Sequence, residues 1–262
     1  MRLTTRRIKI IPKVLRTFKN WPVCFAAYLG LIRGDVTYTL RDNTRILARA
    51  GTQDIGVILD VYALDCYRAY EIGDEDVVVD IGAHIGVFSM LAAKRATRGK
   101  IFAFEPLPQN FSFLERNIQL NSANNVMLFN KAVGGKQERR RLFIPEFKGK
   151  PFYSAASFYA ESLQTKFMEV EAITLQGILD LTGRIDFLKI DAEGAEAEIL
   201  VGLERELFSG IKRISLECHD YYFKRAIYGE LAAALSNHGF KVEMETTLFA
   251  NINSEMLYAR KD

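Results

Sequence analysis

The chain has 262 residues, 49% of them hydrophobic and 26% charged, which is enough to bury a large core without disulfide or metal cross-links. Its six prolines and eighteen glycines exclude collagen-like and low-complexity proteins. The formal net charge of +3 hides an asymmetry, because residues 1–20 carry seven cations and no acid, which leaves −4 on residues 21–262. A nucleic-acid binder spreads positive charge over a folded face, so no nucleic-acid partner is expected.

The first twenty residues predict a basic amphipathic helix. Apolar residues recur at helical spacing between Ile8 and Phe18, with cations between them. The first interpretation is a solvated helix packed on the domain, and the second is peripheral contact of residues 1–20 with a membrane surface. We predict residues 1–50 as a basic, helical N-terminal extension and residues 51–262 as the main domain.

The apolar run at residues 21–32 and the cysteines bear on localisation. The run contains Pro22, is shorter than the ~20 residues that span a bilayer, and is followed by no small-residue cleavage site. Neither a membrane span nor an export signal is therefore predicted. The chain has three cysteines, Cys24, Cys66 and Cys218, and no CxxC pair. An odd number at such wide spacing favours free thiols in a reducing compartment. The expected location is cytoplasmic.

Further along the chain, strands and helices begin to alternate. Residues 36–40 favour a short strand and residues 57–70 a helix, within a pattern that is otherwise irregular up to about residue 73. The strands predicted after that span residues 77–81, 101–104, 126–129, 187–190 and 211–216, and residues 240–244 and 256–258 form a closing hairpin. The helices predicted between them lie around residues 87–94, 111–118 and 195–207. This order predicts an α/β fold with a doubly wound, parallel sheet.

Residues 135–182 interrupt this alternation. They contain a stretch rich in Tyr, Ser and Phe at 152–159 and an alternating strand candidate at 168–173. Long insertions between sheet strands are often binding loops, so we expect this one to cover the substrate. The alternative is an extra β-hairpin packed on the edge of the sheet.

The strongest local motif lies where the first strand ends and the next helix begins. It reads Asp80-Ile81-Gly82-Ala83-His84-Ile85-Gly86. Glycines there let the backbone turn tightly and approach a ligand at the carboxyl end of the strand. Their spacing is GxxxG rather than GxGxxG, and the preceding carboxylate would repel a pyrophosphate. The motif therefore favours a cationic or neutral ligand, and a plain tight turn is the other interpretation.

A second carboxylate supports a nucleoside ligand. Glu105 ends the second predicted strand, where α/β nucleoside sites place an acid that accepts hydrogen bonds from the ribose hydroxyls. The alternative interpretation is a surface carboxylate at a strand end.

Several motifs in order resemble one known family over roughly residues 57–219. They are the Asp80 to Gly86 turn, Phe104-Glu105-Pro106, the pattern of Asn117, Leu120 and Asn121, Lys131-Ala132-Val133-Gly134, and Phe187-Leu188-Lys189-Ile190-Asp191-Ala192-Glu193-Gly194-Ala195-Glu196. The chain resembles the FkbM-type family of S-adenosylmethionine-dependent methyltransferases. The resemblance implies a seven-stranded, mostly parallel, Rossmann-like methyltransferase sheet. It also implies S-adenosyl-L-methionine as cofactor and O-methylation of a hydroxyl of a sugar, polyketide or similar metabolite.

The resemblance also implies a cofactor site, residue by residue. Gly82, Ala83 and Gly86 would line the methionine end, with Asp80 facing its amino group directly or through water. Glu105 would hold the ribose, with Pro106 and Asn110 at the rim, and Lys131, Ala132 and Val133 would flank the adenine. His84 stands where many members have Asn, which keeps a polar side chain at the turn.

Candidate catalytic residues follow the fourth and fifth predicted strands. A hydroxyl is a poor nucleophile while it keeps its proton, so a general base would help. Asp191 and Glu193 are the leading candidates, with Glu217 and His219 behind them. Strand alternation puts Lys189 on the face of Asp191, where it either holds that carboxylate ionised or forms a purely structural pair.

Other functions stay open at this point. No full ligand set for a hard cation occurs at tight spacing, so no metal is predicted. His238, before Gly239, suggests a helix C-terminal cap rather than a catalyst. Two functions other than methyl transfer are considered. An NAD-dependent oxidoreductase or epimerase would have the same kind of sheet but a different glycine spacing. A non-catalytic cofactor-binding module of a biosynthetic assembly is the other alternative. The expected partner is a small-molecule or glycan acceptor, and the pattern predicts no oligomeric state.

Overall fold

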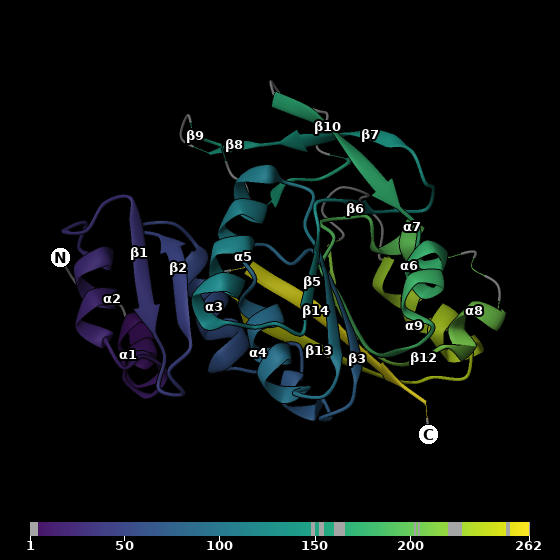
Figure 1. The fold of residues 1–262 in the computed structure, drawn as a ribbon, viewed down its shortest axis with the longest axis horizontal. Coiled ribbons are helices and arrows are strands. Elements are labelled where there is room, and N and C mark those ends of the chain that lie inside the picture. The colour runs from purple at the N-terminus through teal and green to yellow at the C-terminus, as the bar shows by residue number, and fades with distance from the viewer. Residues whose placement is uncertain are drawn as a thin grey trace.

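The computed structural model describes residues 5–147, 150–151, 155–159, 166–201, 203, 205–219, 227–249 and 252–261. Its centre is a seven-stranded sheet in the order β13-β14-β12-β11-β3-β4-β5 (Figure 1). The bounds of these strands are β3 (Val77–Ile81), β4 (Lys100–Phe104), β5 (Val126–Phe129), β11 (Ile185–Ile190), β12 (Ile211–Cys218), β13 (Lys241–Phe249) and β14 (Ile252–Arg260). The pairs from β12 to β5 are parallel, whereas β14 runs antiparallel to both of its neighbours. The predicted seven-stranded, mostly parallel sheet and its closing hairpin are confirmed.

Helices cover both faces of this sheet. Because strand residues alternate in direction, Val78 and Val79 point into two different core clusters. The cluster of Val78 includes residues of α3 (Asp54–Tyr62), α4 (Val87–Arg95) and α5 (Pro108–Asn121). The cluster of Val79 includes residues of α6 (Leu175–Thr182), α7 (Glu196–Leu200), α8 (Arg205–Ser209) and α9 (Ile227–Asn237). The sheet is therefore doubly wound, as predicted.

The chain reverses its direction of winding between two central strands. It moves outward from β3 to β4 and β5, and later returns to the other side of β3 as β11. The carboxyl ends of β3 and β11 therefore flank the topological switch point, where open α/β sheets bind ligands.

The N-terminal segment combines helices with a hairpin. It contains α1 (Thr5–Thr17), α2 (Trp21–Tyr28), β1 (Asp35–Thr39) and β2 (Arg45–Arg49). The first helix agrees with the one predicted between Ile8 and Phe18. Phe18, Tyr38 and Ile46 are buried in the same core cluster as Leu114 of α5, so this segment packs continuously on the sheet domain.

Two predicted helices are shorter than expected. The helix predicted at residues 57–70 ends at Tyr62, because Asp65 and Arg68 adopt positive φ angles of 49° and 53°, and only the short 3-10 turn η1 (Ala69–Glu71) follows. The helix predicted at 195–207 is divided into α7 and α8, because Val201 is extended, with ψ at 134°. His238 follows α9, as expected, and its ring stacks on Phe208 with centroids 4.2 Å apart.

The insertion at residues 135–182 forms additional β-structure. Strand β6 (Ala132–Val133) comes just before the insertion. The insertion itself contains β7 (Arg139–Ile144), β8 (Glu146–Phe147), β9 (Lys150–Pro151) and β10 (Lys166–Ile173). β10 pairs antiparallel with β7 and parallel with β6, and the three lie beside the main sheet (Figure 1). Part of the predicted stretch 152–159 lies outside the described residues, and the covering of a substrate stays a prediction.

The fold makes a testable prediction at Asn117. This fully buried side chain donates to Leu47 O and Ile85 O, and it accepts from Leu47 N, so it ties β2 to α5 and to the glycine turn. Asn117→Ala leaves these backbone groups without partners. We expect it to lower the free energy of unfolding by about 1–3 kcal/mol in chemical denaturation. The exposed Asn124→Ala is the control, and an equal loss in both variants would contradict the assignment.

Candidate active site

The glycine turn after β3 is fixed by close backbone contacts. Gly82 N and Ala83 N both donate to Phe104 O, at 3.0 and 2.9 Å. Gly82 has φ +74°, and a Cβ there would lie 1.9 Å from Asp191 O. Gly86 has φ +88°, and a Cβ there would lie 2.5 Å from Leu114 Cδ1. The left-handed backbone favours glycine at both positions, and at Gly82 a side chain would also displace the backbone of the loop after β11.

Asp80, at the end of β3, forms a buried ion pair beneath this turn. Its side chain is fully buried, with Oδ2 accepting from Ser89 Oγ at 2.5 Å and Oδ1 lying 3.2 Å from Lys189 Nζ. The same ammonium donates to Gly82 O at 2.7 Å. Both carboxylate oxygens of Asp80 are thus engaged within the protein. The expectation that Asp80 faces the amino group of the cofactor, directly or through water, stays a prediction.

Glu105 caps the other side of the turn. Its Oε2 accepts from His84 N at 2.8 Å, and its Oε1 accepts from Leu107 N at 3.0 Å and Asn110 Nδ2 at 3.4 Å. Burial raises the pKa of Glu105 to about 7, although these three donors oppose the shift. A carboxylate offers about four acceptor positions. Acceptor capacity therefore remains on Oε2 for a ligand hydroxyl.

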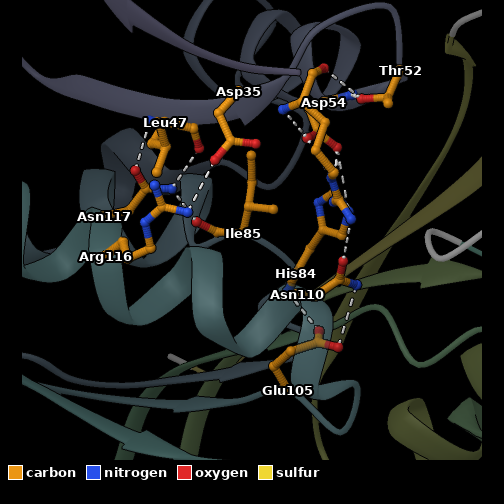
Figure 2. A network of polar contacts seen from close by, with 11 residues as sticks. Asp35, Leu47, Thr52, Asp54, His84, Ile85, Glu105, Asn110, Arg116 and Asn117 are labelled. Carbon is orange, nitrogen blue, oxygen red and sulfur yellow. Dashed lines mark hydrogen bonds and ion pairs between the residues drawn. The ribbon is translucent and has the colours of Figure 1, made fainter.

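A network from the N-terminal hairpin reaches the same site (Figure 2). Arg49 at the end of β2 pairs with Asp54 at 2.9 Å, donates to Asn110 Oδ1 at 2.9 Å and lies 3.2 Å from His84 Nε2. Burial lowers the pKa of His84 to about 4, so its imidazole is neutral and Nε2 accepts from the guanidinium. His84 also has a positive φ of 54°. The network holds Asn110 in position to donate to Glu105.

Pro106 and the segment 131–133 lie beside this site. Pro106 is half-buried next to Glu105, and Asn130 Nδ2 donates to the carbonyl oxygens of both residues. Lys131 Nζ pairs with Glu171 of β10 at 3.2 Å, and Ala132 and Val133 are buried in β6. These three residues join β6 to β10. Their expected contact with an adenine ring stays a prediction.

A second polar cluster gathers at the carboxyl ends of β11 and β12. His219 Nε2 lies 3.8 Å from carboxylate oxygens of Asp191, Glu193 and Glu217, and His219 Nδ1 lies 2.9 Å from Glu196 Oε1. The two strands are parallel neighbours, so their ends meet at one edge of the sheet. The structure thus brings together all the residues that were predicted as catalytic candidates.

Tyr67 connects two members of this cluster. Its hydroxyl lies 3.0 Å from Asp191 Oδ2 and 2.8 Å from Glu217 Oε2, and burial together with these anions raises its pKa well above the usual range. Tyr67 therefore stays a neutral hydrogen-bond donor. Sequence reasoning missed it, because it lies in an irregular stretch with no motif. Glu196 was also missed, although it ends a quoted motif.

The charges in this cluster are complementary. Burial raises the pKa of Asp191, but Lys189, His219 and the Tyr67 hydroxyl outweigh burial and hold that pKa below its ordinary value. Burial lowers the pKa of His219, but Glu193, Glu196 and Glu217 raise it well above its ordinary value. At neutral pH Asp191 is thus an anion and His219 a cation. Asp191 is consequently better suited than His219 to accept a proton.

The cluster also has the spacing of a cation site. Ligating atoms of Asp191, Glu217 and His219 all lie within 4.8 Å of one another. The sequence did not reveal this grouping, because the residues come from the ends of two separate strands. The prediction that the protein uses no metal stays untested.

Known proteins resemble this chain over most of its length. The family model described as Methyltransferase FkbM domain matches residues 80–242. Methyltransferase 1 of Beauveria bassiana is 25% identical over 227 residues, covering 78% of this chain and 88% of that protein. The 31-O-demethyl-FK506 methyltransferase FkbM of Streptomyces tacrolimicus is 28% identical over 262 residues, covering 87% of this chain and 98% of that protein. The crystal structure of methyltransferase FkbM from Methylobacillus flagellatus superposes with a TM-score of 0.49 and 13% identity, covering 78% of this chain and 55% of that chain.

The packing of the glycine turn can be tested by substitution. Gly82 and Gly51 have almost equal φ angles, +74° and +73°, but a Cβ at Gly51 meets nothing within 4 Å. Both alanine variants bear the cost of a left-handed backbone, and only Gly82→Ala forces the Asp191 carbonyl aside. We expect Gly82→Ala to lose about 1–3 kcal/mol more stability than Gly51→Ala in denaturant titrations. Equal losses would show that the contact is not tight.

Proposed function

The chain belongs to the FkbM methyltransferase family, and we propose that it transfers a methyl group from S-adenosylmethionine to a hydroxyl of a sugar, polyketide or similar metabolite. The observation that carries this proposal is the pairing of two sites at the switch point. A turn held by Glu105 follows β3, and an ionised Asp191 follows β11. The name of the Streptomyces tacrolimicus relative specifies methylation at an oxygen, which supports a hydroxyl acceptor.

The residues around the glycine turn fit this cofactor. When bound, S-adenosylmethionine supplies a methyl group on a positively charged sulfur. Glu105 would accept a hydrogen bond from a ribose hydroxyl through the acceptor capacity that His84 N, Leu107 N and Asn110 leave on it. Gly82 and Ala83 would line the methionine end of the cofactor.

Asp191 is the group best placed to receive the proton of the acceptor hydroxyl. Tyr67 and Lys189 both contact Oδ2, at 3.0 and 3.5 Å, which orients the carboxylate. Its side chain is 25% exposed, whereas that of Lys189 is 3% exposed. Asp191 is thus ionised and accessible, and it can hold a hydroxyl by hydrogen bonding and take up its proton. Lys189 acts behind it as a positioning residue.

The proposal is tested by ligand binding and by turnover. S-adenosylhomocysteine should raise the midpoint of thermal unfolding and NAD should not, since the glycine spacing does not suit a pyrophosphate. A mass-spectrometric screen of glycans and polyketides should then find an acceptor that gains one methylene unit. Asp191→Asn should abolish this gain while binding S-adenosylhomocysteine normally. Stabilisation by NAD alone would overturn the proposal, and binding without turnover on any acceptor would favour a non-catalytic module.

Cofactor affinity should depend on pH through Glu105. The pKa of this carboxyl is about 7, and its ionised form is the stronger acceptor for a ribose hydroxyl at Oε2. Binding therefore favours the deprotonated state, and affinity should rise with pH. We expect the dissociation constant of S-adenosylhomocysteine to fall about tenfold from about pH 6 to about pH 8 in calorimetry. Glu105→Gln should bind more weakly, with no such pH dependence; a retained slope in that variant would assign it to another group.

A further inference from the structure

Helix α2 exposes apolar side chains that its packing on the domain does not need. Cys24 and Ala27 are buried and attach the helix to the core. Phe25 also packs against the core, whereas Trp21, Tyr28 and Leu29, at steps of seven and one residues, are exposed and form a separate stripe, which we call the α2 stripe. Trp21 is 40% exposed, Tyr28 and Leu29 are each 60% exposed, and Leu31 just beyond them is 76% exposed.

Positive charge surrounds this stripe. The first acid of the chain is Asp35, so residues 1–34 carry eight cations and no anion. Lys13, Arg16 and Lys19 are exposed on the segment before α2, and Arg33 is exposed after it. The rest of the chain carries a net negative charge, so the basic character of the protein is concentrated at this end.

Both features lie at one extremity of the molecule. Figure 1 shows α1 and α2 together beyond the β1–β2 hairpin, at the left of the view, on the side away from the main sheet. Among the described residues, no helix combines the length and apolar character needed to cross a membrane. Helix α2 itself has only eight residues.

We propose that α1 and α2 dock the protein on an anionic membrane surface, with α2 lying in the plane of the interface. Lysine and arginine attract acidic headgroups, and tryptophan and tyrosine favour the boundary between headgroups and acyl chains. Leu29 on the stripe and Leu31 just beyond it add apolar burial in the acyl region. This combination of aromatic, aliphatic and cationic side chains distinguishes a lipid surface from a nucleic acid, which would not bury the leucines.

A second copy of the chain is a less suitable partner for the α2 stripe than an anionic membrane. A two-fold contact brings the same surface of both protomers together, and here it would oppose two sets of cations. An anionic bilayer instead neutralises them. This inference is independent of the proposed function, because it involves no residue of the candidate active site.

The single tryptophan of the chain makes the proposal directly measurable. Because it is Trp21, its fluorescence reports on the stripe alone. Vesicles of phosphatidylglycerol and phosphatidylcholine should shift the emission of the wild-type protein to shorter wavelength and co-sediment it, and brominated lipids should quench it. Vesicles of phosphatidylcholine alone should give no such shift, and high salt should reverse the binding.

Matched variants separate apolar from electrostatic contributions. Leu29→Ser combined with Leu31→Ser should lower the partition coefficient at least about tenfold. Leu181→Ser is the control, because Leu181 is also exposed, at 49%, but lies on α6. Lys13→Gln combined with Arg16→Gln should weaken binding to the anionic vesicles. Thermal unfolding and S-adenosylhomocysteine binding of each variant show whether it is folded.

Three results would overturn the proposal. The emission of Trp21 could stay unchanged with anionic vesicles, or the Leu181→Ser control could lose binding as strongly as the stripe variant. The protein could also self-associate without lipid and thereby protect Trp21 from a soluble quencher, in which case a second copy covers the stripe. If the wild type binds vesicles but not S-adenosylhomocysteine, the docking surface stands and the proposed function fails.

Discussion

The buried ion pair between Asp80 and Lys189 joins the two central strands at the point where ligands bind in this fold. Such a pair persists only when hydrogen bonds satisfy the remaining donors and acceptors, and here Ser89 and the carbonyl of Gly82 do so. Because Lys189 also lies 3.5 Å from Asp191, one ammonium contacts both the glycine turn and the proposed base. The glycine turn after β3 and the carboxylate after β11 are thus held in position by the same side chain.

The N-terminal hairpin is part of the same arrangement. The family match begins at residue 80, yet Arg49 reaches across to His84 and Asn110, which both donate to Glu105. Asn117 makes a second connection from α5 to β2. The segment before the matched domain therefore supports the conformation of the glycine turn, although none of its residues is proposed to take part in the chemistry.

Sequence reasoning succeeded where a local pattern determines the structure. Uninterrupted apolar runs such as Val77 to Val79 identify strands buried on both faces, and their order identifies the switch point. It failed where long-range contacts decide. Nothing near Tyr67 shows that its hydroxyl will meet Asp191. The ion pair of Asp80 with Lys189 likewise depends on the pairing of β3 with β11, which are far apart in the sequence. The break at Val201 is followed in the sequence by Gly202, a signal that the prediction of one continuous helix over residues 195–207 overlooked.

The position of β14 has a consequence for biosynthesis. The strand that ends the described chain lies between β12 and β13, in the interior of the sheet rather than at its edge. Until it emerges from the ribosome, β12 presents an unpaired edge, and the first two hundred and fifty residues cannot complete their core. The edge of β12 therefore stays open to other chains until β14 is synthesised, and pairing with β14 is the step that protects it.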